Sequence, residues 1–183
     1  INFDFLDEND DYDNPLGESS GAGTIFGTTG GVIEATLRTA YEFLTGEELT
    51  QVEFEQVRGL EGTKIAEVDI QGKKVRIGVV NGLGNARRLL EKIRSGEEEF
   101  HAVEIMACPG GCIAGGGQPY HHGDMEVIRK RQQALYREDR KKTVRQSHKN
   151  PSVIQLYKEF LGEPYGELAH KYLHTSYKAK PRM

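Results

Sequence analysis

Two cysteines four positions apart are the residues in this sequence best suited to chemistry. Cys108 and Cys112 enclose only proline and glycine, so no bulky side chain separates the thiols. Thiolates ligate iron–sulfur clusters, and amide N–H groups that point at the sulfurs tune the cluster potential. The surrounding glycines would let a cluster approach the backbone and would supply such amides: Gly110, Gly111, Gly115, Gly116 and Gly117. The spacing alone also allows buried or incidental thiols, because a complete cluster normally needs four ligands.

Histidines offer two further metal-binding hypotheses. His121 and His122 follow the cysteines and could complete a Cys2His2 zinc site, although adjacent histidines and crowded glycines argue against it. His170 and His174 stand four residues apart, a spacing that can clamp a metal on one helix face. Packing and hydrogen bonding at the end of the domain is the favoured interpretation of that second pair.

Composition narrows the function classes. The 183 residues include 24 basic and 28 acidic side chains, and the net charge of −4 gives no positive field for a nucleic acid. No apolar run approaches the roughly 20 residues that span a bilayer. Two closely spaced cysteines suit a reducing compartment, so we expect a cytoplasmic protein. The amino end lacks an initiator Met and a targeting segment, so we expect a soluble piece whose start lies upstream.

The amino-terminal third predicts a connector, a glycine-rich loop and a helix. Residues 1–20 are acidic and turn-prone, typical of a connector or the start of a lobe. The glycine-rich stretch 19–31 then opens an amphipathic helix, Val32 to Leu44, that ends before Gly46. This loop could cradle a phosphate, but it lacks the G-x-G-x-x-G register after a strand and a P-loop lysine.

The middle of the chain predicts an α/β fold with a parallel or mixed sheet flanked by helices. Strands are expected at Val52–Val57, Ile65–Ile70, Lys74–Val80 and Phe100–Met106, with a helix at Asn85–Arg94. Gln71-Gly72 offers a tight turn between two of these strands. The strand, helix, strand order indicates a parallel crossover that ends directly at the cysteines.

The last third is predicted to be helical. Asp124 can cap a charged helix from Met125 to Arg140, and a second helix runs from Asn150-Pro151 to Leu161. In the stretch 167–174, Leu168, Tyr172 and Leu173 share one helical face. The expected division is therefore a connector at 1–20, an α/β lobe at 21–147 and a helical segment at 148–183.

A basic run accompanies the charged helix. It comprises Arg129, Lys130, Arg131, Arg137, Arg140, Lys141, Lys142 and Arg145. Such a stripe could guide an acidic electron-donor protein through complementary charge. More often it is a solvated helix face.

The cysteine segment as a whole resembles a known family. Glu104 to Pro119 resembles the third signature motif of FeFe (iron-only) hydrogenases, with every fixed position filled. The stretch from Pro15 to Ala35 resembles the glycine-rich loop and helix that precede this motif, and the tail from Gly162 to Tyr177 resembles the carboxyl end of the family. The resemblance covers nearly the whole chain and implies one lobe of the H-cluster domain.

The resemblance also implies a cofactor and its ligands. The cofactor would be the H-cluster, a 4Fe-4S cubane that a cysteine thiolate bridges to a diiron subcluster where hydrogen is made or split. Cys108 would ligate the cubane, Cys112 would be the bridge, and Met106, Phe26 and Val32 would line the diiron pocket as the catalytic surroundings. Cofactor-binding positions would be Gly27, Gly30, Gly31, Gly110, Gly111, Gly115, Gly116, Gly117 and Gln118.

In the family, two earlier motifs supply the other cubane ligands, a proton-passing cysteine and a lysine that holds a cyanide ligand, and this sequence contains none of them. We therefore expect the site to be completed by the rest of the catalytic subunit or by a separate chain. Electrons would come from ferredoxin or an NAD(P)-linked subunit, and the chain alone would be inactive. A noncatalytic hydrogenase-like assembly protein and a metal-free fragment remain alternatives, and Met106 with Gln118-Pro119 favours the enzyme.

Overall fold

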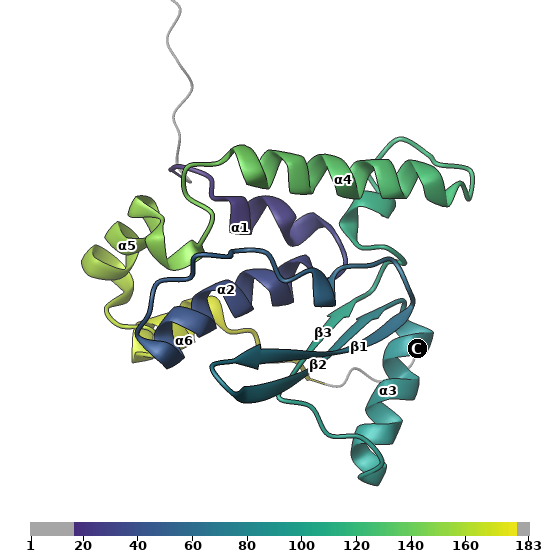
Figure 1. Ribbon diagram of the computed structural model, residues 1–183, viewed down its shortest axis with the longest axis horizontal. Helices are drawn as coiled ribbons and strands as arrows, with labels where there is room; N and C mark the ends of the chain where they lie inside the picture. Colours follow the sequence, from purple (N-terminus) through teal and green to yellow (C-terminus); the bar gives the residue numbers. More distant parts are fainter. Residues whose placement is uncertain (1–16, 179–183) are drawn as a thin grey trace, which may run out of the picture.

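The computed structural model describes residues 17–178, so most of the expected connector lies outside the described range. A three-stranded mixed sheet lies at the centre, in the order β1-β2-β3. Strand β1 (Thr63–Ile70) pairs antiparallel with β2 (Lys73–Asn81), and β3 (Ala102–Met106) pairs parallel with β2. The α/β class with a mixed sheet is confirmed (Figure 1).

The hairpin between β1 and β2 forms where the sequence predicts it. Gln71 and Gly72 both adopt positive φ angles, 49° and 82°, as a two-residue hairpin turn of strands with right-handed twist requires. The Asp69 carboxylate accepts a hydrogen bond from the Gly72 amide at 2.8 Å. Residues of β1 alternate between the core and solvent, which fixes the register of the pair.

The crossover from β2 to β3 runs through α3 (Leu83–Ser95), which covers one face of the sheet. Leu89 packs there with Val80 and Ala86. A Cβ atom at Gly78 would lie only 3.3 Å from Leu89 Cδ2, so this glycine lets the helix approach the strand closely. Gly96, at φ 77°, ends the helix, and both the helix and the parallel crossover are confirmed.

The opposite face of the sheet packs against α2 (Gly31–Thr45), which confirms the helix predicted there. The buried core between this face and α2 comprises Ile33, Leu37, Leu49, Phe54, Val57, Ala66, Val68, Ile70, Ile77 and Val79. The predicted strand at residues 52–57 was wrong: this segment is irregular and ends in a 3-10 turn, η3 (Glu55–Val57). Phe54 and Val57 insert into the core, and the Phe54 amide donates to the Glu34 carboxylate of α2, so the segment is held against a helix and not in the sheet.

The stretch before α2 is more regular than the predicted glycine-rich loop. It forms a short helix, α1 (Gly21–Thr24), continued by η2 (Ile25–Gly27), and the Ser20 hydroxyl caps it by accepting from the Gly23 amide. A Cβ atom at Gly21 would lie 2.0 Å from Asp139 Oδ1. The glycine therefore serves close packing against a later helix.

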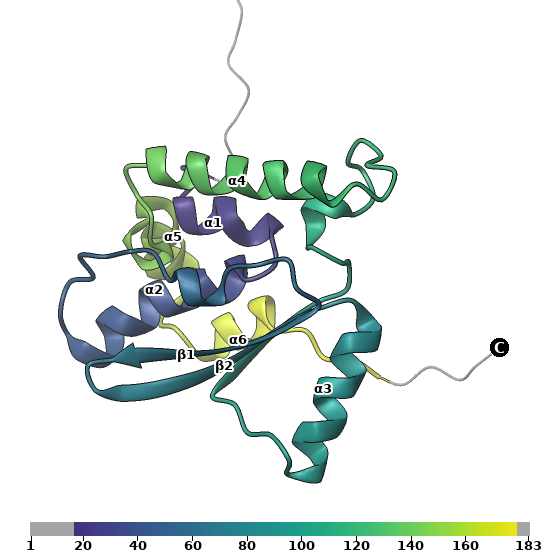
Figure 2. The same cartoon turned by 45° about the vertical axis from the view of Figure 1, so that its right-hand side comes forward.

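That later helix is α4 (Met125–Lys141), which lies over α1 as an outer layer (Figures 1 and 2). The Asp124 carboxylate accepts from the Glu126 amide and begins the helix as predicted. Tyr136 of α4 is buried with Ala22, Ile25 and Ala35. The order of layers is α3, the sheet, α2, and then α1 with α4.

The chain ends in short helices beside α2. After η5 (Ser147–Lys149), Asn150 caps α5 (Pro151–Leu156), which continues as a π-helical turn, η6 (Tyr157–Leu161), to Gly162. The predicted helix is confirmed, with its last turn widened. In α6 (Glu167–Leu173) the predicted apolar face is exposed, and Ala169 is the buried residue. Within residues 17–178 no helix is long and apolar enough to cross a membrane.

Candidate functional site

The cysteine loop, residues 108–117, begins where β3 ends. Met106 is the last residue of the strand, and its carbonyl accepts from the Gly82 amide at 2.8 Å. Asn81, at the end of the parallel neighbour β2, accepts from the Gly110 amide at 3.1 Å and donates to the Glu61 carbonyl at 2.7 Å. The predicted position of Met106 is confirmed. Residues 108–117 form an irregular loop with one 3-10 turn, η4 (Cys112–Ala114).

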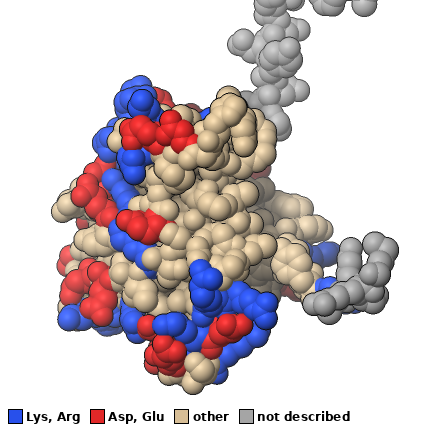
Figure 3. All heavy atoms as spheres, turned by 90° about the vertical axis from the view of Figure 1, so that its right-hand side faces the viewer, with Lys and Arg blue, Asp and Glu red and all other residues tan. Residues whose placement is uncertain are grey.

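Both thiols are free and exposed on this loop. A Cβ atom at Gly115 would lie 3.2 Å from Cys108 Sγ, so a larger residue would crowd the sulfur. Residues 105–120 contain no Lys, Arg, Asp or Glu. Seen from the right of Figure 1, charged side chains gather along one side and at the lower end, with a broad uncharged area between them (Figure 3). Two accessible soft ligands in uncharged surroundings fit half of the ligand set of a cubane cluster.

The glycine-rich stretch before α2 touches the cysteine loop directly. A Cβ atom at Gly111, whose φ is 96°, would lie 2.8 Å from the Thr29 amide nitrogen and 2.9 Å from the Gly27 carbonyl oxygen. The Thr29 amide donates to the Gly110 carbonyl at 3.2 Å, and its hydroxyl lies 3.9 Å from the Met106 sulfur. The structure thus brings together the glycine-rich stretch and the cysteine motif, which lie about 80 residues apart in the sequence.

Glu104 connects β3 to the start of α2. Its buried carboxylate accepts from the Gly30 amide at 2.7 Å and from the Ile33 amide at 2.8 Å. A carboxylate at this position satisfies free N–H groups and complements the helix dipole. Burial raises the pKa of Glu104, and the amides of Ile33, Gly30 and Val32 oppose that rise. The sequence predicted no role for this residue, although an acidic residue flanked by Val103 and Ile105 in a predicted strand was an available signal.

A buried ion network joins α2 to α4 and was not anticipated. The Arg38 guanidinium donates to both oxygens of Asp139 at 2.8 Å and to Glu34 at 2.9 Å, and all three side chains are fully buried. Arg58 donates twice to Glu34 at 2.7 Å, and Arg145 donates to Asp139 at 2.6 Å. Each buried charge therefore has an opposite partner, as burial requires.

The basic run divides between structural and exposed positions. Arg131 donates to backbone carbonyls of the cysteine region, and Arg145 belongs to the ion network, so the solvated-face interpretation was wrong for these two residues. Other members lie on the surface, where Arg129 pairs with Glu126. Attraction of an acidic electron donor by the exposed members stays a prediction.

The histidines do not assemble a metal site with the cysteines. Within the described part of the chain no three His, Cys, Asp or Glu side chains are grouped so that they could hold a metal. The Cys2His2 hypothesis was therefore wrong for this arrangement, in which His121 Nδ1 accepts from the Gly123 amide. His170 and His174 contact each other, with ring centroids 4.2 Å apart.

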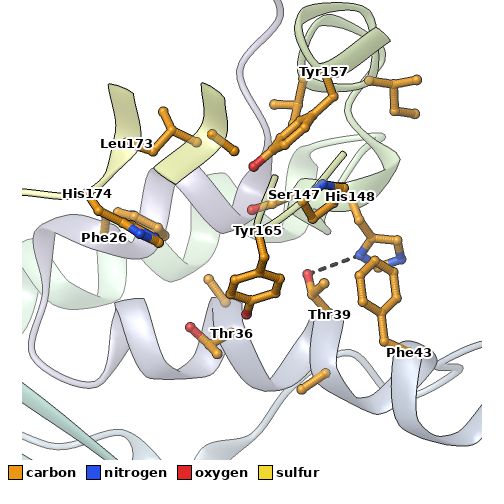
Figure 4. A pocket seen from close by; sticks show the side chains of 16 residues that line it. Phe26, Thr36, Thr39, Phe43, Ser147, His148, Tyr157, Tyr165, Leu173 and His174 are labelled. Carbon is orange, nitrogen blue, oxygen red and sulfur yellow. Dashed lines mark hydrogen bonds between the residues drawn. The ribbon is translucent and has the colours of Figure 1, made fainter. Parts of the chain in front are cut away.

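The other residues expected around the diiron unit are Phe26, which lies in η2, and Val32, which lies in the first turn of α2. Phe26 lines an apolar groove of about 620 Å³ between α2 and the carboxyl-terminal helices, beside His174 (Figure 4). Val32 is half-buried in the first turn of α2. The glycines Gly30 and Gly31 begin that helix, and a Cβ atom at either one would clash with backbone oxygen atoms. The roles of Phe26 and Val32 stay predictions.

The fold and the site define an α/β lobe that presents two exposed thiols at the carboxyl end of a strand. Residues 1–116 match the family described as iron only hydrogenase large subunit, C-terminal domain, and residues 125–180 match iron hydrogenase small subunit. The chain belongs to the iron-only (FeFe) hydrogenase family, which confirms the resemblance.

Individual relatives agree. The chain is 56% identical over its whole length to the NADP-reducing hydrogenase subunit HndD of Solidesulfovibrio fructosivorans, covering 31% of that protein. It is 42% identical to iron hydrogenase 1 of Clostridium pasteurianum, over 93% of this chain and 30% of the relative. A solved structure of a variant of FeFe-hydrogenase HydA1 from Chlamydomonas reinhardtii matches with a TM-score of 0.66 and 44% identity, over 91% of this chain and 48% of that one. The chain thus spans about a third of these curated relatives.

Two further relatives bear on the function and on the cellular location. The large subunit of a periplasmic iron hydrogenase from Nitratidesulfovibrio vulgaris is 44% identical over 68% of this chain and matches over 30% of its own length. Protein NAR1 of Arabidopsis thaliana is 30% identical over 84% of this chain and matches over 33% of its own length.

Proposed function

We propose that this chain forms part of an FeFe hydrogenase that reversibly converts protons and electrons to hydrogen. The observation that carries the proposal is the pair of exposed thiols, Cys108 and Cys112, on an uncharged loop at the end of β3 in a chain of this family. Cys108 would ligate the cubane of the H-cluster, and Cys112 would bridge it to the diiron subcluster. The bound cluster supplies the redox chemistry.

The protein residues of this chain would hold and orient the cluster. Gly115 keeps the backbone close to the Cys108 thiol, Gly110 and Gly111 let the loop pack closely against its neighbours, and Gly116, Gly117 and Gln118 continue the exposed loop. Met106, held near Thr29, would face the diiron unit, with Phe26 and Val32 contributing apolar surface. Gly27 would keep the facing backbone close to the cysteine loop, and Gly30 and Gly31 would let the start of α2 pack closely against Val57 and Ile25.

Residues outside this chain would complete the site. Two thiolates supply half of the four cubane ligands, and the chain spans about a third of its hydrogenase relatives. An NAD(P)-linked electron-transfer subunit is the favoured partner, because the relative at 56% identity is named an NADP-reducing hydrogenase subunit. Ferredoxin is the alternative donor. We place the protein in the cytoplasm and keep the division at residue 147 between the lobe and the carboxyl-terminal segment.

Replacing Cys112 with Ser in the complete protein tests the proposal. Cys112→Ser should abolish hydrogen turnover, because the Cys112 thiolate would both anchor the diiron unit and connect it electronically to the cubane. Hydrogen evolution with a reduced dye and iron content would be measured together. Ala107→Ser, which adds a hydroxyl to an exposed neighbouring position, serves as the control and should remain active. Turnover by Cys112→Ser near the level of the control would refute the assignment.

A noncatalytic assembly protein is the second candidate, supported by the 30% identity with NAR1. Such a protein would bind a cubane but would evolve no hydrogen even when the other cluster motifs and the maturation machinery are present. Met106 beside the cysteine loop and the Gln118-Pro119 ending favour the enzyme. The same measurement of turnover and iron separates the two candidates.

A further inference from the structure

One face of α4 lies against the two loops of the candidate site, which are the cysteine loop and the glycine-rich stretch at residues 27–30. Its residues recur at the spacing of a single helical face, namely Ile128, Arg131, Gln132 and Leu135. This helix belongs to the part of the chain that matches the small subunit, whereas the glycine-rich stretch and the cysteine loop up to Gly116 belong to the part that matches the large subunit. Contacts of α4 with Thr28, Gly110 and Ile113 therefore cross from one part to the other.

Apolar contacts and one hydrogen bond set the separation between α4 and the loops. A Cβ atom at Gly110 would lie 3.1 Å from Ile128 Cγ2, and one at Gly27 would lie 3.1 Å from Leu135 Cδ1. Ile128 is fully buried. Gln132 Nε2 donates to the Thr28 hydroxyl at 2.8 Å. The helix thus touches a glycine in each loop.

Arg131 holds the second half of the cysteine loop. Its Nη1 donates to the Ile113 carbonyl at 2.7 Å, and its Nη2 donates to the Pro119 carbonyl at 2.6 Å. Ile113 directly follows Cys112, and Pro119 lies just beyond the last glycine of the loop. A planar guanidinium can hold two carbonyls at a fixed separation, whereas an ammonium is a single flexible point donor.

We propose that α4 positions the cysteine loop and that Arg131 is its main positioning residue, setting the conformation of the backbone around Cys112. The inference deepens the proposed function, since a cluster on this loop would sense the orientation of the peptide groups whose carbonyls Arg131 holds. The small-subunit-like part of the chain would then contribute directly to the geometry of the cluster site. Arg131 acts through the loop and touches no reacting atom.

The test compares Arg131→Lys and Arg131→Gln with Arg137→Lys, an exposed arginine of the same helix, in the complete protein. Amide hydrogen exchange of residues 112–118 is measured in the cluster-free protein, and the midpoint potential of the cubane is measured after reconstitution. Both Arg131 variants should exchange about tenfold faster at the Ala114 and Gly115 amides, which donate to carbonyls within the loop, because losing a hydrogen bond to a charged group lets the loop open more often. Their cubane potential should shift, and Arg137→Lys should match the unsubstituted protein in both measurements.

Exchange at residues 112–118 that stays unchanged in Arg131→Lys and Arg131→Gln would overturn the inference. Equal acceleration in the β1–β2 hairpin would do the same, since it would show general destabilisation. An unshifted cubane potential in both variants would refute the effect on the cluster. If the unsubstituted protein accepts no cubane, the proposed function fails, while the exchange measurement still decides whether Arg131 orders the loop.

Discussion

Gly111 occupies the tightest contact between the two loops of the candidate site. Its φ of 96° lies in the region that favours glycine, and the Thr29 amide and the Gly27 carbonyl leave no room for a side chain. At Gly116, five residues later, a Cβ atom would lie in open space. The two glycines therefore belong to the same motif for different physical reasons.

Gly111→Ala should lower the free energy of unfolding by about 2 kcal/mol, because alanine is strained at this φ and its methyl group would force the two loops apart. Chemical denaturation of the chain would measure the loss. Gly116→Ala is the matched control and should unfold like the unsubstituted protein. Equal stability of the two variants would contradict the close approach at Gly111.

A second prediction at the scale of a single residue concerns Glu104. Glu104→Gln keeps the size of the side chain but leaves one acceptor oxygen for two helix amides, so it should cost about 1–2 kcal/mol of stability. Denaturant unfolding would be compared with Glu67→Gln, an exposed glutamate on β1. A loss no larger than that of the control would show that the carboxylate does not hold the start of α2.

Helices α2 and α4 are held together by charge as well as by apolar packing. Burial by itself would raise the pKa of Asp139. Hydrogen bonds and charge attraction from Arg38 and Arg145 outweigh this effect, so the pKa of Asp139 lies below its usual 3.8. A carboxyl group whose pKa is lower in the folded state stabilises that state above the unfolded pKa. This stabilisation is lost as the pH falls through the folded pKa.

Asp139→Asn should therefore destabilise the protein by about 3 kcal/mol at neutral pH, because it leaves Arg38 buried with an incomplete set of partners. The unfolding free energy would be measured from pH 7 down to pH 3. The unsubstituted protein should lose stability below about pH 4, and the variant should show a shallower loss. Glu138→Gln, an exposed neighbour on α4, should retain both the stability and its pH dependence.

The whole molecule combines parts that match two different hydrogenase subunits. Residues 17–116 carry the sheet and the cysteine loop, and residues 125–178 wrap around α1 and α2 (Figures 1 and 2). Besides the ion network, the Gly21 amide donates to the Val144 carbonyl, and the Asn150 side chain donates to the Glu18 carbonyl. These contacts cross the junction independently of the covalent link.

A chain cut by a specific protease between His121 and Gly123 should remain associated at neutral pH, since buried Ile128, Tyr136 and Asp139 attach the second part to the first. Size-exclusion chromatography of the cluster-free cut protein would check this expectation. The same cut in Asp139→Asn should weaken the association. Separation of the two pieces of the otherwise unsubstituted protein would contradict the interface.

Local patterns in the sequence were enough to predict several elements and the location of the cysteine loop. Gln71-Gly72 favours a hairpin whatever surrounds it, Gly96 ends a helix, and the short apolar strand before Cys108 marks the position of Met106. These signals depend on backbone conformation and on the period of apolar residues within a few positions. Family membership likewise follows from a contiguous string of residues.

Only the tertiary structure revealed what holds that loop in place. Glu104 meets Gly30 across 74 residues, Arg38 meets Asp139 across 101, and Arg131 meets Ile113 from a different helix. The segment 52–57 has the composition of a strand, but contacts with α2 outweigh that preference. Such pairings depend on how the layers pack, because a buried charge or polar group is stable only beside partners that the folded chain brings to it from distant positions.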